Sequence, residues 1–365
     1  MRVVVKLGTS SLTDEAGRID EPAMAKAAAE LAAARAAGHE TLVVTSGAVA
    51  AGLPALGIPA DERPRDAQTL QAVSAVGQVL LMQTWSRHLS DHDLVAGQVL
   101  LAPLDFMVRS QYLHARSTIE RLLELGVVPV VNENDAIADD EIRFGDNDRI
   151  AALLAQLVQA ELLLLLTDAP GLMDADPRVD DTATLIEEIV EVDHELEGLA
   201  GGAGSVRGSG GMASKLAAAK MASWAGVRAV IADAGRPEVV RDALAGISGT
   251  GTTVLPRPAG LSARKLWIAF ALPAEGAVTV DAGAARALAG GGRSLLAAGV
   301  VGVEGAFDAQ AAVEIVDADG RAVAKGISSV SAADLAAMAG QRSSDLAGGS
   351  GEVVHVDDLV VLPGR

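Results

Sequence analysis

The chain has 365 residues, of which 50% are hydrophobic, and this length allows one large α/β domain and a small second one. It contains no cysteine, which excludes disulfides, thiolate metal sites and cysteine nucleophiles, and is compatible with a reducing cytoplasm. The formal net charge of -19 disfavours binding to nucleic acid and anionic membranes, so an anionic substrate would need local positive groups.

Strand-like apolar runs alternate with helical patterns over the first two thirds of the chain. The strand-like runs cover 3–7, 41–45, 94–101, 127–131, 162–167 and 227–231, and the helical patterns include 23–37, 67–88 and 112–125. Strands that alternate with helices form parallel sheets covered on both faces. The pattern therefore predicts an α/β domain with a mainly parallel open sheet sandwiched by helices.

The pattern changes after Pro256 and Pro258. Short strand-like pieces follow at 276–280, 299–305, 312–316 and 353–355. They indicate a compact β-rich module of the size of a small domain. We therefore expect a first domain over 1–258 and a second over 262–365.

The sequence shows neither the pattern of a signal peptide nor an apolar run that suggests membrane insertion. The opening residues MRVVVKLG lack the form of a signal peptide. The conspicuous apolar run 162–166 is far too short to span a bilayer. The sequence thus predicts a cytoplasmic protein without a membrane partner.

The first chemical motif is VVKLGTS at 4–10. Lys6 stands at the carboxyl end of a predicted strand, where open α/β sheets bind ligands, and Gly8 allows backbone N–H groups to approach an anion. A lysine that merely extends its ammonium to solvent from a strand end would give the same pattern. Lys6 alone therefore leaves both interpretations open.

A second motif is GSGGMASK at 208–215. Glycines that lead into a helix N-terminus form an anion site, and Lys215 adds a point charge for a phosphoryl group. The motif is no Walker A loop, because neither G-K-S nor G-K-T follows the glycines. It matches a relaxed G-x-G-x-x-A pattern, but no predicted strand precedes it, so a dinucleotide fold fits poorly.

Two polar clusters lie between these lysines. The run 127–131 leads into Asn132, Glu133, Asn134 and Asp135, and GDND at 145–148 opens a helical pattern over 149–159. Asp, Asn and Gly are also common in turns and helix caps, which is the simpler explanation for each cluster alone. Together they offer the amide donors and carboxylate acceptors that a bound amino acid requires.

The segments VVKLGTS, VVTSGA, VVNENDAI, GDND, LLLLTD, ADPR and GSGGMASK, in this order, resemble the glutamate 5-kinase branch of the amino acid kinase family, with a C-terminal PUA domain. The resemblance implies ATP-dependent phosphorylation of the L-glutamate γ-carboxylate to L-glutamyl 5-phosphate, the first step of proline biosynthesis, with Mg²⁺. It also implies feedback inhibition by proline and a homo-oligomer, a dimer or a tetramer.

The same resemblance implies roles for individual residues. Lys6, Lys215 and Asp148 become catalytic, with Asp148 organising the lysines, and Ser46, Asp135 and Asn147 contact glutamate. The nucleotide contacts are Lys6, Gly8, Thr167, Asp168, Ser209, Gly210, Gly211, Met212, Ala213, Ser214 and Lys215. No side chains are assigned to a metal. Pro170, Met173 and His114 depart from the family pattern, and His114 receives no role.

Two alternatives remain beside this function. The first is another acid kinase of the same fold, acting on aspartate, acetylglutamate or carbamate. The second is an RNA-binding protein that acts through the PUA-like domain. Residues 262–365 contain 8 Lys and Arg against 12 Asp and Glu, a net charge of -4, and lack the basic character typical of RNA binders, so RNA is not an expected partner.

Overall fold

The computed structural model describes residues 1–14, 17–59, 62–102, 105–106, 108–137, 147–176, 179–201, 211–258, 260–270, 272–342 and 351–362. These residues form two compact units, Met1–Gly260 and Leu261–Arg365. In the described part of the chain, every helix is too short or too polar to cross a bilayer.

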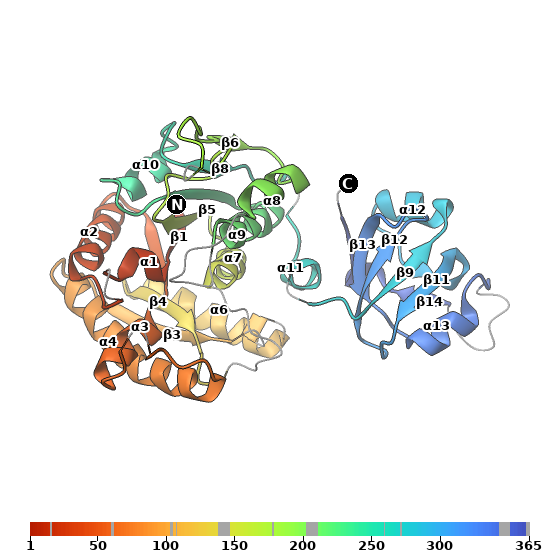
Figure 1. Ribbon diagram of the computed structural model, residues 1–365, viewed down its shortest axis with the longest axis horizontal. Helices are drawn as coiled ribbons and strands as arrows, with labels where there is room; N and C mark the ends of the chain where they lie inside the picture. Colours follow the sequence, from red (N-terminus) through yellow and green to blue (C-terminus); the bar gives the residue numbers. More distant parts are fainter. Residues whose placement is uncertain are drawn as a thin grey trace. The chain divides into compact units, whose positions relative to one another are not determined.

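The first unit is built on an eight-stranded sheet of order β3-β4-β2-β1-β5-β7-β8-β6 (Figure 1). The pairings are parallel except for β7 with β8, so the predicted mainly parallel sheet is confirmed. The strands are β1 (Arg2–Leu7), β2 (Glu40–Thr45), β3 (Ala96–Leu101), β4 (Val128–Glu133), β5 (Leu162–Thr167), β6 (Glu188–Ile189), β7 (Arg228–Asp233) and β8 (Thr252–Val254).

Helices cover both faces of this sheet, as the alternating pattern predicts. Figure 1 shows α2 and the pair α7 and α9 on opposite sides of β1 and β5. The helices with described bounds in this unit are α1 (Thr9–Leu12), α2 (Glu21–Ala36), α3 (Ala48–Ala55), α4 (Ala67–Ser90), α6 (Arg109–Glu124), α7 (Asn147–Leu157), α8 (His194–Ala200), α9 (Met212–Trp224) and α10 (Val239–Ala245).

The pleat of β1 decides which face each of its side chains reaches. Val3, Val5 and Leu7 join the core formed with α2, α4 and α10. Successive side chains of a strand point to opposite faces, so Lys6 points to the other face, which α7 and α9 cover. The same alternation puts Leu162, Leu164 and Leu166 of β5 in the α2 core. The position of Lys6 in the alternation of β1 is thus sufficient to direct its side chain toward α7 and α9.

Helices α3 and α4 approach each other backbone to backbone. A Cβ atom on Gly77 would lie 1.8 Å from the carbonyl oxygen of Ala48, and one on Gly52 would lie 2.0 Å from that of Val73. No side chain fits at either position, so glycine permits the contact. This packing fixes α4 beside the loop that joins β2 to α3.

The chain order of the strands reverses at β1. β1 lies between β2 and β5, and the chain adds β2, β3 and β4 on one side before it crosses to β5 on the other. In open α/β sheets, ligands bind beyond the carboxyl ends of the strands at such a reversal. We therefore expect a ligand site among the residues at the carboxyl ends of β1, β2, β4 and β5.

The second unit contains a five-stranded sheet of order β11-β9-β12-β13-β15 and a separate pair β10-β14. Its core includes Val278, Val313 and Ile315. The strands predicted at 276–280 and 312–316 are confirmed as β9 (Gly276–Val280) and β12 (Ala312–Val316). The other described α-helices and strands are α11 (Ala263–Phe270), α12 (Ala282–Ala289), β10 (Leu295–Leu296), β11 (Val300–Gly305), β13 (Ala322–Ile327), α13 (Ala332–Met338), β14 (Glu352–Val354) and β15 (Leu359–Val361).

Candidate active site

Two lysines from opposite ends of the first unit meet on one buried carboxylate. Nζ of Lys6 lies 2.5 Å from Oδ1 of Asp148, and Nζ of Lys215 lies 3.4 Å from Oδ2. The hydroxyl of Ser214 donates a hydrogen bond of 2.8 Å to the same Oδ2. Lys6 and Lys215 expose only 3% and 4% of their surfaces, and Asp148 exposes 0%. The cluster therefore holds two positive charges and one negative charge away from bulk water.

Three elements bring these groups together. Lys6 is near the carboxyl end of β1, Asp148 lies in the first turn of α7, and Lys215 lies in the first turn of α9. A carboxylate is stabilised at a helix N-terminus by the helix dipole. The ammonium groups need a counter-charge because they are buried. The structure thus gathers the three residues to which the family resemblance assigns catalytic roles, and those roles stay predictions.

The charge state of Asp148 follows from its neighbours. Burial alone would raise the pKa of the Asp148 carboxyl, but the positive charges of Lys6 and Lys215, with hydrogen bonds from Lys6 and Ser214, hold that pKa below its ordinary value. Asp148 is therefore ionised at neutral pH. It can position both ammonium groups without an added ligand.

The predicted nucleotide loop is described only in part. Gly211 precedes α9 in an extended conformation, and Met212, Ala213, Ser214 and Lys215 form the first turn of the helix. Ser209 and Gly210 lie outside the described residues. Gly8 precedes α1, and a Cβ atom there would lie 3.5 Å from Nζ of Lys6. A side chain at position 8 would place apolar atoms beside this ammonium group.

A chain of side-chain amides links β4, α7 and the end of β2. Nδ2 of Asn147 donates to Oγ of Ser46 and to Oδ1 of Asn132, both at 2.9 Å. Oδ1 of Asn147 accepts from the backbone N–H of Glu133 at 3.2 Å. Two of the predicted glutamate contacts, Ser46 and Asn147, are therefore neighbours. Asn147 precedes Asp148, so this group of polar side chains adjoins the lysine cluster.

Helix α4 supplies two polar partners that the sequence analysis missed. Oγ of Ser74 donates to Oδ2 of Asp135 at 2.5 Å, and Oε1 of Gln78 accepts from Nδ2 of Asn132 at 2.7 Å. Ser74 and Gln78 are four residues apart and both buried, among the apolar residues that face the core. Polar residues at helical spacing on a buried helix face were the available signal. We use the name acid pocket for the group of polar side chains formed by Ser46, Ser74, Gln78, Asn132, Asp135 and Asn147.

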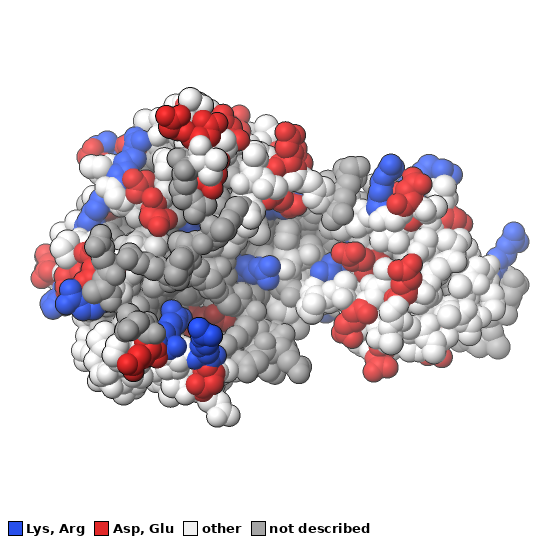
Figure 2. Space-filling model, viewed as in Figure 1, with Lys and Arg blue, Asp and Glu red and all other residues white. Residues whose placement is uncertain are grey.

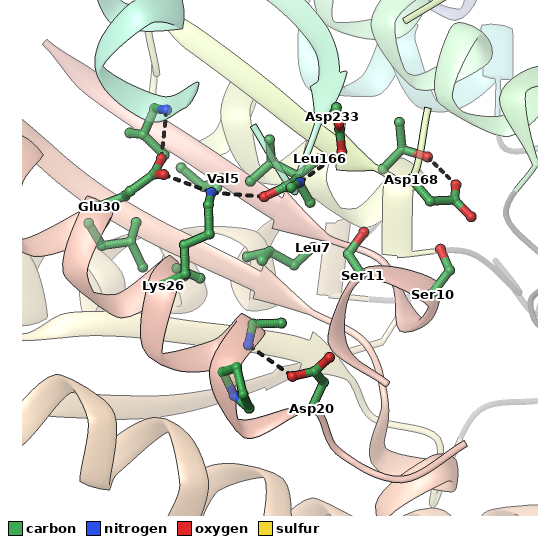
Figure 3. Close-up of a pocket in the computed structure, with 18 residues that line it drawn as sticks. Val5, Leu7, Ser10, Ser11, Asp20, Lys26, Glu30, Leu166, Asp168 and Asp233 are labelled. Atoms are coloured by element: carbon green, nitrogen blue, oxygen red, sulfur yellow. Dashed lines mark hydrogen bonds and ion pairs between the residues drawn. The ribbon is translucent and has the colours of Figure 1, made fainter. Parts of the chain in front are cut away.

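The predicted nucleotide contacts Thr167 and Asp168 end β5 on the other side of β1. The Thr167 hydroxyl donates to Oδ1 of Asp168 at 3.1 Å. Both residues also line a cavity of about 390 Å³ on the α2 face of the sheet, whose floor includes Val5, Leu7 and Leu166 (Figure 3). This cavity therefore lies on the face of β1 opposite to Lys6.

The lining of this cavity is unsuited to a triphosphate. Figure 3 shows Lys26 and Glu30 of α2 reaching toward the loop after β7, with Asp168 and Asp233 nearby. Lys26 donates to Glu30 at 2.7 Å and to the carbonyl oxygen of Ala234 at 2.8 Å, so its charge is engaged. An acidic lining repels phosphate groups. The groups suited to phosphate are those of the lysine cluster.

Comparison with known proteins identifies the family. Residues 1–233 match the amino acid kinase family. The chain belongs to that family. Residues 276–349 match the PUA domain, so this amino acid kinase carries the C-terminal PUA domain that the sequence predicts.

Two relatives that this amino acid kinase matches over nearly their whole length are named glutamate 5-kinase. The glutamate 5-kinase of Burkholderia ambifaria is 43% identical over 99% of this chain and 98% of its own length. That of Moorella thermoacetica is 44% identical over 99% of this chain and 96% of its own. A crystal structure of T. acidophilum isopentenyl phosphate kinase in a product complex covers 70% of this chain and 100% of its own, with 17% identity and a TM-score of 0.49.

The family's use of ATP raises the question of a metal ion. Among the described residues, no group of three or more His, Asp or Glu side chains could hold one. Mg²⁺ in kinases commonly binds through one or two carboxylates and the substrate's phosphates, rather than in a protein cage. Asp168 is an exposed carboxylate at the carboxyl end of β5 and fits that mode. Asp148 does not, because its oxygens contact Lys6, Lys215 and Ser214.

Proposed function

We propose that this protein is a glutamate 5-kinase, which transfers the γ-phosphoryl group of ATP to the γ-carboxylate of L-glutamate and releases L-glutamyl 5-phosphate. One observation carries the proposal: Lys6 and Lys215 converge on Asp148 directly beside the acid pocket. The full-length similarity to glutamate 5-kinases supports the same conclusion.

The reaction needs charge neutralisation more than proton transfer. A glutamate γ-carboxylate has a pKa of about 4.3 and is ionised at neutral pH, so no general base is required. The obstacle is the approach of this anion to the anionic γ-phosphate. Lys6 and Lys215 provide positive charge where negative charge develops in the transition state, and Asp148 holds them in place beforehand.

The order of groups along the sheet edge suits an in-line transfer. Residues of the acid pocket lie at the carboxyl ends of β2 and β4, Lys6 is on β1, and Thr167 ends β5 with Asp168 next in the chain. An acid bound on the β4 side and a nucleotide bound on the β5 side would meet near Lys6. We propose Ser46, Asp135 and Asn147 as glutamate contacts, and Gly8, Thr167, Asp168 and 209–215 as nucleotide contacts. Mg²⁺, when bound, would neutralise the phosphates.

A coupled assay of ADP release tests this function and its alternative. The full chain is incubated with Mg·ATP and, separately, glutamate, aspartate, acetylglutamate or carbamate. We expect turnover with glutamate at a kcat/KM well above that for the other acids. Preference for one of the other three would establish a different acid kinase of this fold.

We further propose that proline inhibits at a site overlapping the acid pocket and that the protein forms a homo-oligomer. Val76, Val79 and Leu80 on α4 are exposed, and β3 is an edge strand, which supports an interface with a second copy. RNA binding is not proposed. On the face shown in Figure 2, the described basic side chains of the second unit are interspersed with acidic ones.

A further inference from the structure

Gln78 carries a buried hydrogen-bond donor that lacks an acceptor. The residue exposes 8% of its surface, and its Nε2 has no hydrogen-bond partner among the described residues. Leaving a buried donor unsatisfied costs stability, so such a group in a native protein calls for an explanation. A bound ligand that supplies the acceptor would explain the unpaired donor. The hydrogen bonds and neighbours of Gln78 bear on this explanation.

The hydrogen bonds around Asn132 determine which end of the Gln78 amide has no partner. Oδ1 of Asn132 accepts from the backbone N–H of Glu133 and from Nδ2 of Asn147, both at 2.9 Å. Nδ2 of Asn132 must therefore face Gln78, and Gln78 must present its oxygen in return. If the oxygen and nitrogen of the Gln78 amide were exchanged, its NH₂ group would face the NH₂ group of Asn132, and neither could accept a hydrogen bond. The free group is consequently the NH₂ group, which binds only an acceptor.

The neighbours of Gln78 place this donor at the acid pocket. Ser74, one turn earlier on the same face of α4, binds Asp135. Gln78 itself connects through Asn132 and Asn147 to Ser46. This face of α4 therefore contributes two side chains to the acid pocket, on the β4 side of the lysine cluster.

We propose that Gln78 determines specificity for the amino acid substrate, because its Nε2 donates a hydrogen bond to the substrate's α-carboxylate. The proposal rests on the proposed function, in which the γ-carboxylate faces Lys6 and Lys215. The α-carboxylate is then the acceptor left for the β4 side. The α-ammonium group cannot accept a hydrogen bond, and the carboxylate of Asp135 suits it instead.

Two substitutions in the full chain separate this role from a purely structural one. Gln78→Glu retains an oxygen for Asn132 but replaces the free donor by an acceptor, whereas Gln78→Met removes both. We expect Gln78→Glu to raise the KM for glutamate roughly tenfold to a hundredfold, the range for a hydrogen bond to a charged group, with the KM for ATP unchanged. Gln83→Glu, at an exposed position of the same helix, is the matched control.

The pH profile of Gln78→Glu sharpens the comparison. Burial raises the pKa of a carboxyl group, and a protonated carboxyl can still donate a hydrogen bond. The KM for glutamate should therefore rise with pH as the introduced carboxyl ionises, while the wild type shows no such rise. If Gln78→Glu keeps the wild-type KM across the profile and only Gln78→Met is impaired, Gln78 merely supports Asn132 and the proposal is overturned.

A truncated substrate provides the second readout. 4-Aminobutyrate has the reacting carboxylate of glutamate but no α-carboxylate. We expect Gln78→Met to reduce the preference for glutamate over 4-aminobutyrate roughly tenfold or more, because the wild-type donor has no acceptor in the shorter substrate. An unchanged preference in folded Gln78→Met, checked by thermal melting, overturns the proposal even if Gln78→Glu fails to fold. Wild-type protein inactive on glutamate would overturn the proposed function instead.

Discussion

Lys6 and Asp148 form a buried ion pair in which Nζ and Oδ1 are 2.5 Å apart and neither side chain exposes more than 3% of its surface. Lys215 contacts the other oxygen of the same carboxylate. One carboxylate thus organises two cations that come from β1 and α9, more than 200 residues apart in the sequence.

Asp148→Asn should lower both stability and turnover. The substitution keeps the shape of the side chain but removes the negative charge that the two buried ammonium groups share, and breaking a buried pair this way costs about 3–5 kcal/mol. Urea unfolding at neutral pH measures the loss, and Asp181→Asn at an exposed position is the control. Equal free energies of unfolding for Asp148→Asn and wild type would show that the cluster contributes nothing to stability.

The stability contributed by Asp148 should also depend on pH. Because its folded-state pKa lies below the ordinary 3.8, this contribution is complete above about 3.8 and is lost as the pH falls through the lowered pKa. The difference in unfolding free energy between wild type and Asp148→Asn should therefore be constant near neutrality and shrink in strong acid. A difference that instead grows toward low pH would contradict the lowered pKa.

Lys215→Ala should reduce kcat far more than it raises the KM for glutamate. Loss of one transition-state charge contact costs on the order of 10² to 10³ in rate. Lys6→Ala should behave similarly. Lys220→Ala is the matched control, because Lys220 is on the same helix but pairs with Glu197. Near-normal turnover by Lys215→Ala with an intact circular dichroism spectrum would remove the α9 lysine from the mechanism.

Asn147→Ala and Asp135→Ala should raise the KM for glutamate with little effect on that for ATP, because both residues belong to the acid pocket. The same substitutions should weaken inhibition by proline. Inhibition curves at several glutamate concentrations check the overlap: a proline potency that is independent of glutamate would point to a separate regulatory site.

Removal of the second unit should leave phosphoryl transfer intact, because the proposed catalytic residues all lie within Met1–Gly260. A truncation after Gly260 is assayed for glutamate-dependent ADP release, and the full chain is titrated with labelled structured RNA at increasing salt. Loss of activity in a folded truncation would connect the PUA domain to catalysis. Submicromolar, steeply salt-dependent RNA binding would restore the RNA-binding interpretation.

Much of the sheet could be predicted because its strands are continuous apolar runs. The run 162–167 is β5, and all six of its residues are buried. β13 was missed because its buried positions are the small residues Ala322, Ala324 and Gly326, a weak strand signal. The antiparallel direction of β8 depends on its packing against β7, which local sequence does not encode.

The candidate site also contains some residues that the sequence identifies and others that it does not. Lys6, Asp148 and Lys215 stand in motifs of glycines and polar residues, and the resemblance that these motifs carry assigns them catalytic roles. Gln78 stands in a long helical pattern, and its partner Asn132 lies 54 residues away on β4. The four-residue spacing of Ser74 and Gln78 among apolar residues of α4 is a local sign of burial, but it does not identify their partners. Only the tertiary fold reveals that Gln78 and Ser74 belong to the acid pocket.

Trapping of the acyl phosphate tests the central claim most directly, that paired lysines transfer a phosphoryl group to the side-chain carboxylate of glutamate. The full chain, Mg·ATP and glutamate are incubated with hydroxylamine, which converts an acyl phosphate into a stable hydroxamate. We predict γ-glutamyl hydroxamate in an amount that matches the ADP released, and its near-complete loss in Lys215→Ala but not in Lys220→Ala. ADP release without glutamate-dependent hydroxamate, or equal hydroxamate formation by both variants, would contradict the account.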